Sequence, residues 1–86
     1  AQLAKRWYEA IPGMTASGQY ERSLLYYDAV AVMQPGFAGL HFGRGQVYAL
    51  MGRKAEAINA YTLYLQSDTT SAWAEQARRE IANLRR

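Results

Sequence analysis

The sequence predicts an all-α domain of two antiparallel helix pairs and a closing fifth helix. The first observation is an internal repeat, because Gly18 and Gly52 lie 34 positions apart, as do Tyr27 and Tyr61. The second is that apolar residues recur every three or four positions over most of the chain, which is typical of helices with one buried face. The third is that no stretch alternates apolar and polar residues for long enough to predict a strand.

The first helix is expected to break near its middle. Four apolar residues have helical spacing there: Leu3, Trp7, Ile11 and Met14. Pro12-Gly13 falls inside this pattern, and a proline in a helix interior removes a hydrogen bond and costs about 3 kcal/mol. We therefore expect a regular helix over Gln2–Ala10, followed by a kink or irregular turn up to Gly18.

Proline and glycine mark the ends of the next helices. The second helix is predicted over Tyr20–Met33, because Pro35-Gly36 cannot continue it. The third is predicted over Phe37–Met51 and ends at Gly52, since glycine readily takes the left-handed conformation that closes a helix. The fourth is predicted over Lys54–Gln66, before a polar loop.

The fifth helix, predicted over Ala72–Arg85, has the pattern of a lid. Ser71 is the expected N-cap, and Glu75 lies in the first turn, where a negative charge is favourable. An apolar stripe runs along one face: Trp73, Ala77, Ile81 and Leu84. The other face is polar, as required of the helix that closes a stack of helix pairs.

Composition and motifs argue against catalysis. The 86 residues form one domain at most, and half of them are apolar, which is enough for a packed core. The chain has no cysteine, which excludes a disulfide scaffold and a cysteine-ligated zinc site. Its one histidine, His41, has no acid, thiol or second histidine at helical spacing, so we expect a structural imidazole. We expect no catalytic residue, no metal and no cofactor, because no catalytic or phosphate-binding motif is present.

Charge and hydropathy limit the partners. The net charge is +3, with acidic and basic residues mostly interleaved, which is typical of solvated helix faces. The arginines near the C-terminus lack interleaved aromatic residues, so nucleic acid is not the expected partner. The longest strongly apolar run, Ala29–Met33, is too short to span a bilayer, so we expect no membrane insertion. No signal peptide is visible. Because the first residue is Ala1, we expect the chain to be a fragment of a longer protein.

The register of these features resembles the tetratricopeptide repeat family. That family has a period of 34 and the pattern W-x₂-L-G-x₂-Y, then A-x₃-F, then P. The second repeat matches at Arg44-Gly45-x₂-Tyr48 and Ala57-x₃-Tyr61. The first matches at Trp7, at Ser23-x₃-Tyr27 and at Pro35. The resemblance places repeat one at about 4–37, repeat two at about 38–71 and a capping helix at about 72–86.

Several positions depart from the family pattern. His41 stands where the second repeat would have tryptophan, and Thr69 where it would have proline. Ile11 and Met14 stand where the first repeat would have glycine and tyrosine. Tyr64 occupies a site that is usually small, so the closing helix is expected to pack at a shifted distance.

The resemblance implies a right-handed α-solenoid that acts as an adaptor. In this family the leading helix of each pair lines a concave face, which holds a segment of a partner protein. One branch of the family clamps a partner's terminal carboxylate with basic residues, but the matching positions here are almost without positive charge, so that mode is not expected: Tyr8, Pro12, Gly43, Gln46, Trp73 and Ala77. The alternative function is a structural unit that forms homo-oligomers through an exposed end of the solenoid.

Helix geometry selects candidate partner-binding residues on the leading helices. Leu40, Val47 and Met51 are expected to face the core, which turns Phe42 and Gln46 away from it. Tyr8 lies 34 positions before Phe42, so the two aromatic rings are expected side by side. Lys5 and Trp73 complete the predicted partner-binding set, which is Lys5, Tyr8, Phe42, Gln46 and Trp73. Gln76 lies on the same side of the closing helix as Trp73. An alternative left open is that Phe42 and Tyr8 fill a small core.

Overall fold

The chain folds into five helices. The computed structural model of the chain describes residues 2–34, 36 and 39–86, with side chains from residue 9 onward. Within these ranges there is no strand, and the helices are α1 (Gln2–Ala16), α2 (Tyr20–Met33), α3 (Gly39–Leu50), α4 (Lys54–Ser67) and α5 (Ala72–Leu84). The prediction of an all-α fold of five helices is thereby confirmed for the described part of the chain.

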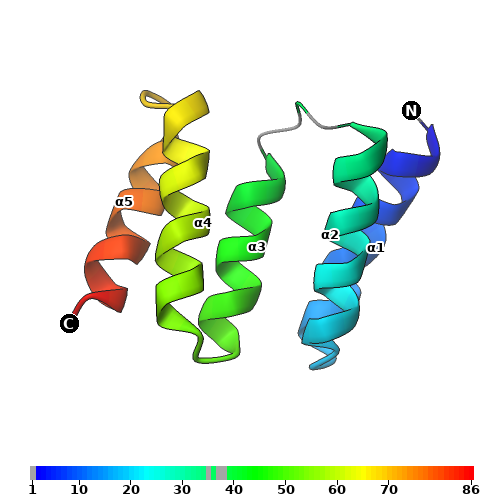
Figure 1. The fold of residues 1–86 in the computed structure, drawn as a ribbon, viewed down its shortest axis with the longest axis horizontal. Coiled ribbons are helices and arrows are strands. Elements are labelled where there is room, and N and C mark those ends of the chain that lie inside the picture. The colour runs from blue at the N-terminus through cyan, green and yellow to red at the C-terminus, as the bar shows by residue number, and fades with distance from the viewer. Residues whose placement is uncertain (1, 35, 37–38) are drawn as a thin grey trace.

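Consecutive helices pack against each other and alternate in direction along the molecule (Figure 1). The molecule measures 36 × 28 × 18 Å, and its shortest extent corresponds to about two helix diameters. In the view of Figure 1, α1 lies behind α2 and α5 lies behind α4, while α3 occupies the centre. The two ends of the chain therefore lie on opposite sides of α3.

Most predicted helix bounds are close to those observed. α2 has the predicted bounds, α4 extends one residue further than predicted, and α5 ends one residue earlier. α3 ends one residue before the predicted Met51, and its predicted first residues, 37 and 38, lie outside the described residues. Ser71 is the N-cap of α5 as predicted, because its side-chain oxygen accepts a hydrogen bond from the Ala74 N–H at 3.2 Å.

The expected end of the regular first helix at Ala10 is wrong. α1 continues through Pro12 to Ala16 as one helix. Ile11, directly before the proline, is fully buried, and Met14, one turn further, packs against the same cluster. Because these side chains anchor α1 on both sides of the proline, tertiary packing offsets the hydrogen bond that Pro12 cannot donate.

The two tight turns, after α1 and after α3, have the same backbone geometry. Gly18 and Gly52 both have positive φ angles, 82° and 78°. In each turn the glycine N–H donates to the carbonyl three residues earlier, at 3.1 Å, and the next N–H donates to the carbonyl five residues earlier, at 2.8 Å after Gly18 and 2.9 Å after Gly52. This pair of bonds is the Schellman motif, which glycine favours because it has no Cβ to clash in the left-handed region.

The core consists of two clusters that share α3. The first joins α1, α2 and α3 through Ile11, Tyr27, Val30, Leu40 and Val47. The second joins α3, α4 and α5 through Phe42, Ala57, Tyr61, Tyr64 and Ala77. α3 therefore buries opposite faces in two different clusters and connects the two halves of the molecule.

Two glycines allow this double burial of α3. A Cβ on Gly43 would lie 2.2 Å from the hydroxyl oxygen of Tyr27, and a Cβ on Gly45 would lie 2.8 Å from the ring of Tyr61. Both distances are far below normal contact, so α2 and α4 approach α3 as closely as they do only because these positions are glycine. Gly43 and Gly45 are therefore packing residues of α3.

Candidate functional site

A groove runs across the molecule between α1 and α5. It comprises a hollow of about 660 Å³ and a second one of about 380 Å³, which share Pro12, Tyr27, Phe42 and Gln46. Its lining includes Pro12 and Thr15 of α1, Tyr27 of α2, Phe42, Gln46 and Leu50 of α3, Tyr61 of α4, and Trp73, Gln76 and Glu80 of α5. Residues of all five helices thus contribute to one concave surface.

The groove presents apolar side chains beside amides. Leu50 is 57% exposed and Trp73 is 61% exposed, although both are large hydrophobic residues. Gln46 lies one helical turn before Leu50, and Gln76 follows Trp73 by three residues, and both glutamines are exposed. Exposed apolar surface with hydrogen-bonding groups beside it is the usual composition of a site that holds a peptide segment.

Phe42 does not stand out from the core as predicted. It is only 7% exposed, and its ring makes edge-to-face contacts with Tyr61, Tyr64 and Trp73, at centroid distances of 5.4, 5.4 and 5.2 Å. The expectation that Phe42 points away from the core is wrong. It considered only the face of α3 with Leu40, Val47 and Met51, whereas α4 and α5 cover the opposite face as well. Phe42 supports the floor of the groove and does not project from it.

The other predicted residues have different outcomes. Gln46 and Trp73 line the groove, as expected of partner-contacting residues. Trp73 was also placed on the apolar stripe of the closing helix, and it contacts Phe42 while leaving most of its surface open. The side chains of Lys5 and Tyr8 lie outside the described residues, so their role and the pairing of Tyr8 with Phe42 stay predictions.

Sequence reasoning missed Leu50 and Glu80. Leu50 follows Gln46 by four residues, and Glu80 follows Gln76 by four and Trp73 by seven, so both lie on the faces that the predicted residues define. This spacing places both residues on the predicted faces, but it does not by itself distinguish them from ordinary exposed residues. Pro12 was treated only as a helix breaker, whereas the structure exposes its ring in the groove.

One negative charge lies in the groove. The Glu80 carboxylate accepts a hydrogen bond from the Gln76 side-chain amide at 2.8 Å. Burial, and then the charge of Glu80, raise the pKa of Tyr61 above its usual range, so this phenol stays neutral and protonated. The groove therefore combines a carboxylate, a neutral phenol and amides with apolar walls.

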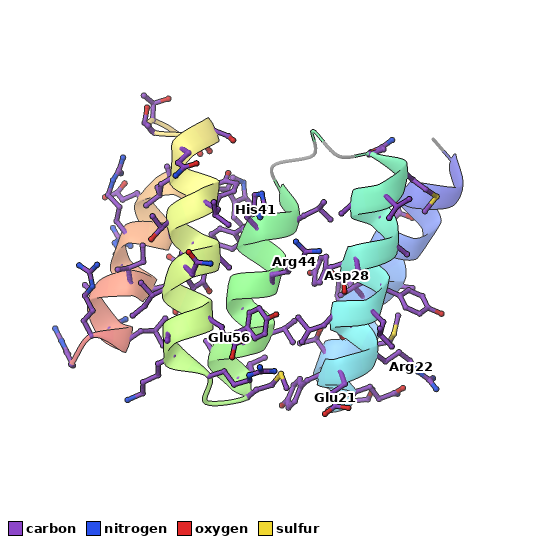
Figure 2. All side chains as sticks on the ribbon, in the orientation of Figure 1. Glu21, Arg22, Asp28, His41, Arg44 and Glu56 are labelled. Carbon is purple, nitrogen blue, oxygen red and sulfur yellow. The ribbon has the colours of Figure 1, made fainter. Side chains whose placement is uncertain are left out.

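The ion pairs of the described residues lie elsewhere. Arg44 of α3 and Asp28 of α2 face each other in Figure 2 and form an ion pair that does not line the groove. His41, one residue before Phe42, has its pKa lowered by burial and by the neighbouring Arg44 charge. No group of three or more potential metal ligands occurs among the described side chains.

Comparison with known proteins does not supply a family. A scan against models of known protein families finds none that matches this sequence, and a search of curated proteins finds no significant match. In the part of the chain that the structure describes, no helix has the length and hydropathy needed to cross a membrane.

Proposed function

We propose that this chain is a tetratricopeptide-like protein–protein interaction module that holds a partner segment in the groove. The observation that carries the proposal is the concave surface to which all five helices contribute, with two large apolar side chains exposed in it. The 34-residue register and the two matching glycine turns add support for the family resemblance. A right-handed solenoid arrangement and a function without catalysis belong to the same proposal.

The test is a selection from a displayed random peptide library against the wild-type chain and matched variants. Trp73→Ala should weaken the selected peptides roughly thirtyfold or more, because truncating an aromatic anchor at the centre of an interface typically costs at least about 2 kcal/mol. Leu50→Ala should also weaken them. Its matched control is Leu25→Ala, since Leu25 on α2 has a similar exposed fraction, 67% against 57%, but does not line the groove.

The selection has a result that rejects the proposal. If every selected peptide binds the Trp73 and Leu50 variants as tightly as the wild type, the groove is not the binding surface. Loss of the same peptides on the Leu25 variant would place binding on the outer face of α2 instead.

A second candidate function is self-association, and the outer face of α2 favours it. Leu25 and Val32 are 67% and 83% exposed, whereas the positions 34 residues later on α4 are the polar residues Asn59 and Gln66, which are also exposed. Two exposed apolar residues on one helix, where its equivalent has polar residues, would suit a surface that another copy covers.

Sedimentation equilibrium tests the second candidate. The double variant Leu25→Asn, Val32→Gln gives α2 the residues of α4 and should convert a dimer to a monomer, while Trp73→Ala should leave the dimer intact. A wild-type chain that stays monomeric at high concentration would remove this candidate.

A further inference from the structure

Glu80 is the only charged residue among the described side chains that line the groove. It lies on the same face of α5 as Trp73 and Gln76, at spacings of seven and four residues. The Gln76 amide donates a hydrogen bond to its carboxylate, and none of the ion pairs among the described residues includes Glu80. The groove thus holds a half-buried negative charge that no described cation neutralises.

Three of the described arginines have partners outside the groove. Arg44 pairs with Asp28, and Arg79 pairs with Glu75 at 3.2 Å. Arg78 donates a hydrogen bond to the backbone carbonyl of Thr69. Although the net charge of the chain is +3, no described basic side chain lines the groove. The described side chains that line the groove therefore carry a net negative charge, opposite in sign to the net charge of the whole chain.

Leu50 lines the same hollow as Glu80, and Trp73 lines the adjoining hollow of the groove. Trp73 is held edge-on to Phe42 at 5.2 Å and leaves most of its ring surface open, and Leu50 is more than half exposed. A guanidinium suits such surroundings better than an ammonium does, because it is planar and weakly hydrated, packs on aromatic rings and bonds a carboxylate with two N–H groups.

We propose that the groove selects a protein segment in which an arginine stands between apolar residues, with the guanidinium on Glu80 and the apolar neighbours against Leu50 and Trp73. The proposal rests on the proposed function of the groove and deepens it by naming the chemistry of the partner. A segment with an acidic residue at the same place is rejected, because its carboxylate would approach Glu80 without a cation between them.

A charge swap in the library selection tests this preference. Peptides selected by the wild-type chain should be enriched in arginine, and peptides selected by Glu80→Lys should be enriched in aspartate and glutamate instead. The matched control is Glu75→Lys, which makes the same change in net charge on the same helix but outside the groove, and it should keep the arginine preference.

A double-mutant cycle on the best arginine peptide measures the contact itself. Glu80→Gln should weaken binding about five- to tenfold, as expected of a partly buried charge-assisted pair, while Glu75→Gln should not change it. Replacing the peptide's arginine by the neutral isostere citrulline should weaken binding to the wild type by the same factor as Glu80→Gln does. The same replacement should hardly weaken binding to Glu80→Gln any further. Raising the ionic strength from about 0.1 M to about 1 M should weaken the arginine peptide selectively.

The outcomes separate the two proposals. Two results would overturn this inference and leave the proposed function standing. In the first, the selected peptides need Leu50 and Trp73 but show no preference for arginine. In the second, peptides selected by Glu80→Lys are still enriched in arginine. Absence of any groove-dependent peptide would end both. Helix content and a cooperative thermal transition establish that each variant is folded, and Glu80→Gln removes the charge with almost no change of shape should the lysine variant unfold.

Discussion

The first helix pair, α1 with α2, and the second, α3 with α4, have the same turn but different interiors. Both turns close on a glycine of positive φ with the same two backbone hydrogen bonds. Inside the second pair, the ring of Tyr61 lies against Gly45. The corresponding position of the first pair, 34 residues earlier, is Ile11, which is fully buried. A glycine thus brings the helices of the second pair together where the first pair uses a bulky side chain.

This difference explains how the pairs are joined. In the first pair Ile11 stands at the position of Gly45, and the end of the Tyr27 ring lies against Gly43 on α3. Tyr27 and Tyr61 are equivalent in the repeat, yet both pack on α3 from opposite sides. A repeated turn therefore does not require a repeated interior, and α3 gains its central position from two glycines that the first leading helix lacks.

The largest expected effect concerns the cluster of the second pair. Phe42→Ala should lower the free energy of unfolding by about 3–5 kcal/mol, because it leaves a cavity among three aromatic rings. Denaturant unfolding followed by circular dichroism measures this loss. Leu50→Ala on the same helix is the control and should change stability by less than about 0.5 kcal/mol, since Leu50 is largely exposed. A Phe42→Ala variant as stable as Leu50→Ala would mean that the Phe42 side chain contributes little to the core.

The close approach inside the second pair predicts opposite effects at two glycines. Gly45→Ala should destabilise the fold by about 1–3 kcal/mol, because the new methyl group meets the buried Tyr61 ring and outweighs the gain in helix propensity. Gly13→Ala, inside α1, should stabilise it by up to about 1 kcal/mol, since nothing lies within 4 Å of the added carbon. Thermal melts of both variants decide the matter. If both are stabilised, Tyr61 moves aside freely and the contrast between the pairs is lost.

The likeness of the two turns predicts equal effects. Gly18→Ala and Gly52→Ala should each cost about 1–2 kcal/mol, because alanine is strained at positive φ although space surrounds both positions. The two losses should agree within about 0.5 kcal/mol, the usual error of such comparisons. A clear difference between the two unfolding midpoints would mean that the turns, too, are unlike.

The sequence was sufficient for features that depend on local chemistry. The bounds of α2, both glycine turns and the Ser71 cap follow from residues within a few positions of each feature. The continuation of α1 through Pro12 could not be predicted, since it depends on how Ile11 and Met14 pack against another helix. The sequence left open whether Phe42 is buried, for the same kind of reason, because α4 and α5 both contribute to its surroundings.

The candidate site was predicted in part. Spacing on a helix identified Gln46 and Trp73, which line the groove. It did not identify Leu50 or Glu80, since an exposed leucine or glutamate on a polar face is common and carries no signal alone. Their meaning comes from the groove, which exists only once α1 and α5 are placed on either side of α3.

The smallest expected effect concerns the C-terminal ends of α2 and α4, where the two helix pairs differ in charge. The C-cap of α2 is Gln34, and the C-cap of α4, 34 residues later, is Asp68. The Asp68 carboxylate accepts hydrogen bonds from the hydroxyls of Ser71 and of Tyr64, the latter at 2.6 Å, and from two backbone N–H groups. These bonds, first that of the Ser71 hydroxyl and then that of Tyr64, lower the pKa of Asp68 from its usual 3.8 to about 2.

A pKa that is lower in the folded chain stabilises the fold only while the group is ionised. The contribution of Asp68 is therefore complete above its usual pKa and is lost as the pH falls through about 2. Asp68→Asn should be less stable than the wild type at neutral pH, and the two urea midpoints should converge on acidification, because all other carboxyls titrate in both chains. Gln34→Ala, the equivalent change in the first pair, should give a difference that does not depend on pH. If the Asp68 difference persists undiminished at low pH, its bonds to Ser71 and Tyr64 do not depend on the charge, and the α4–α5 turn is held by shape alone.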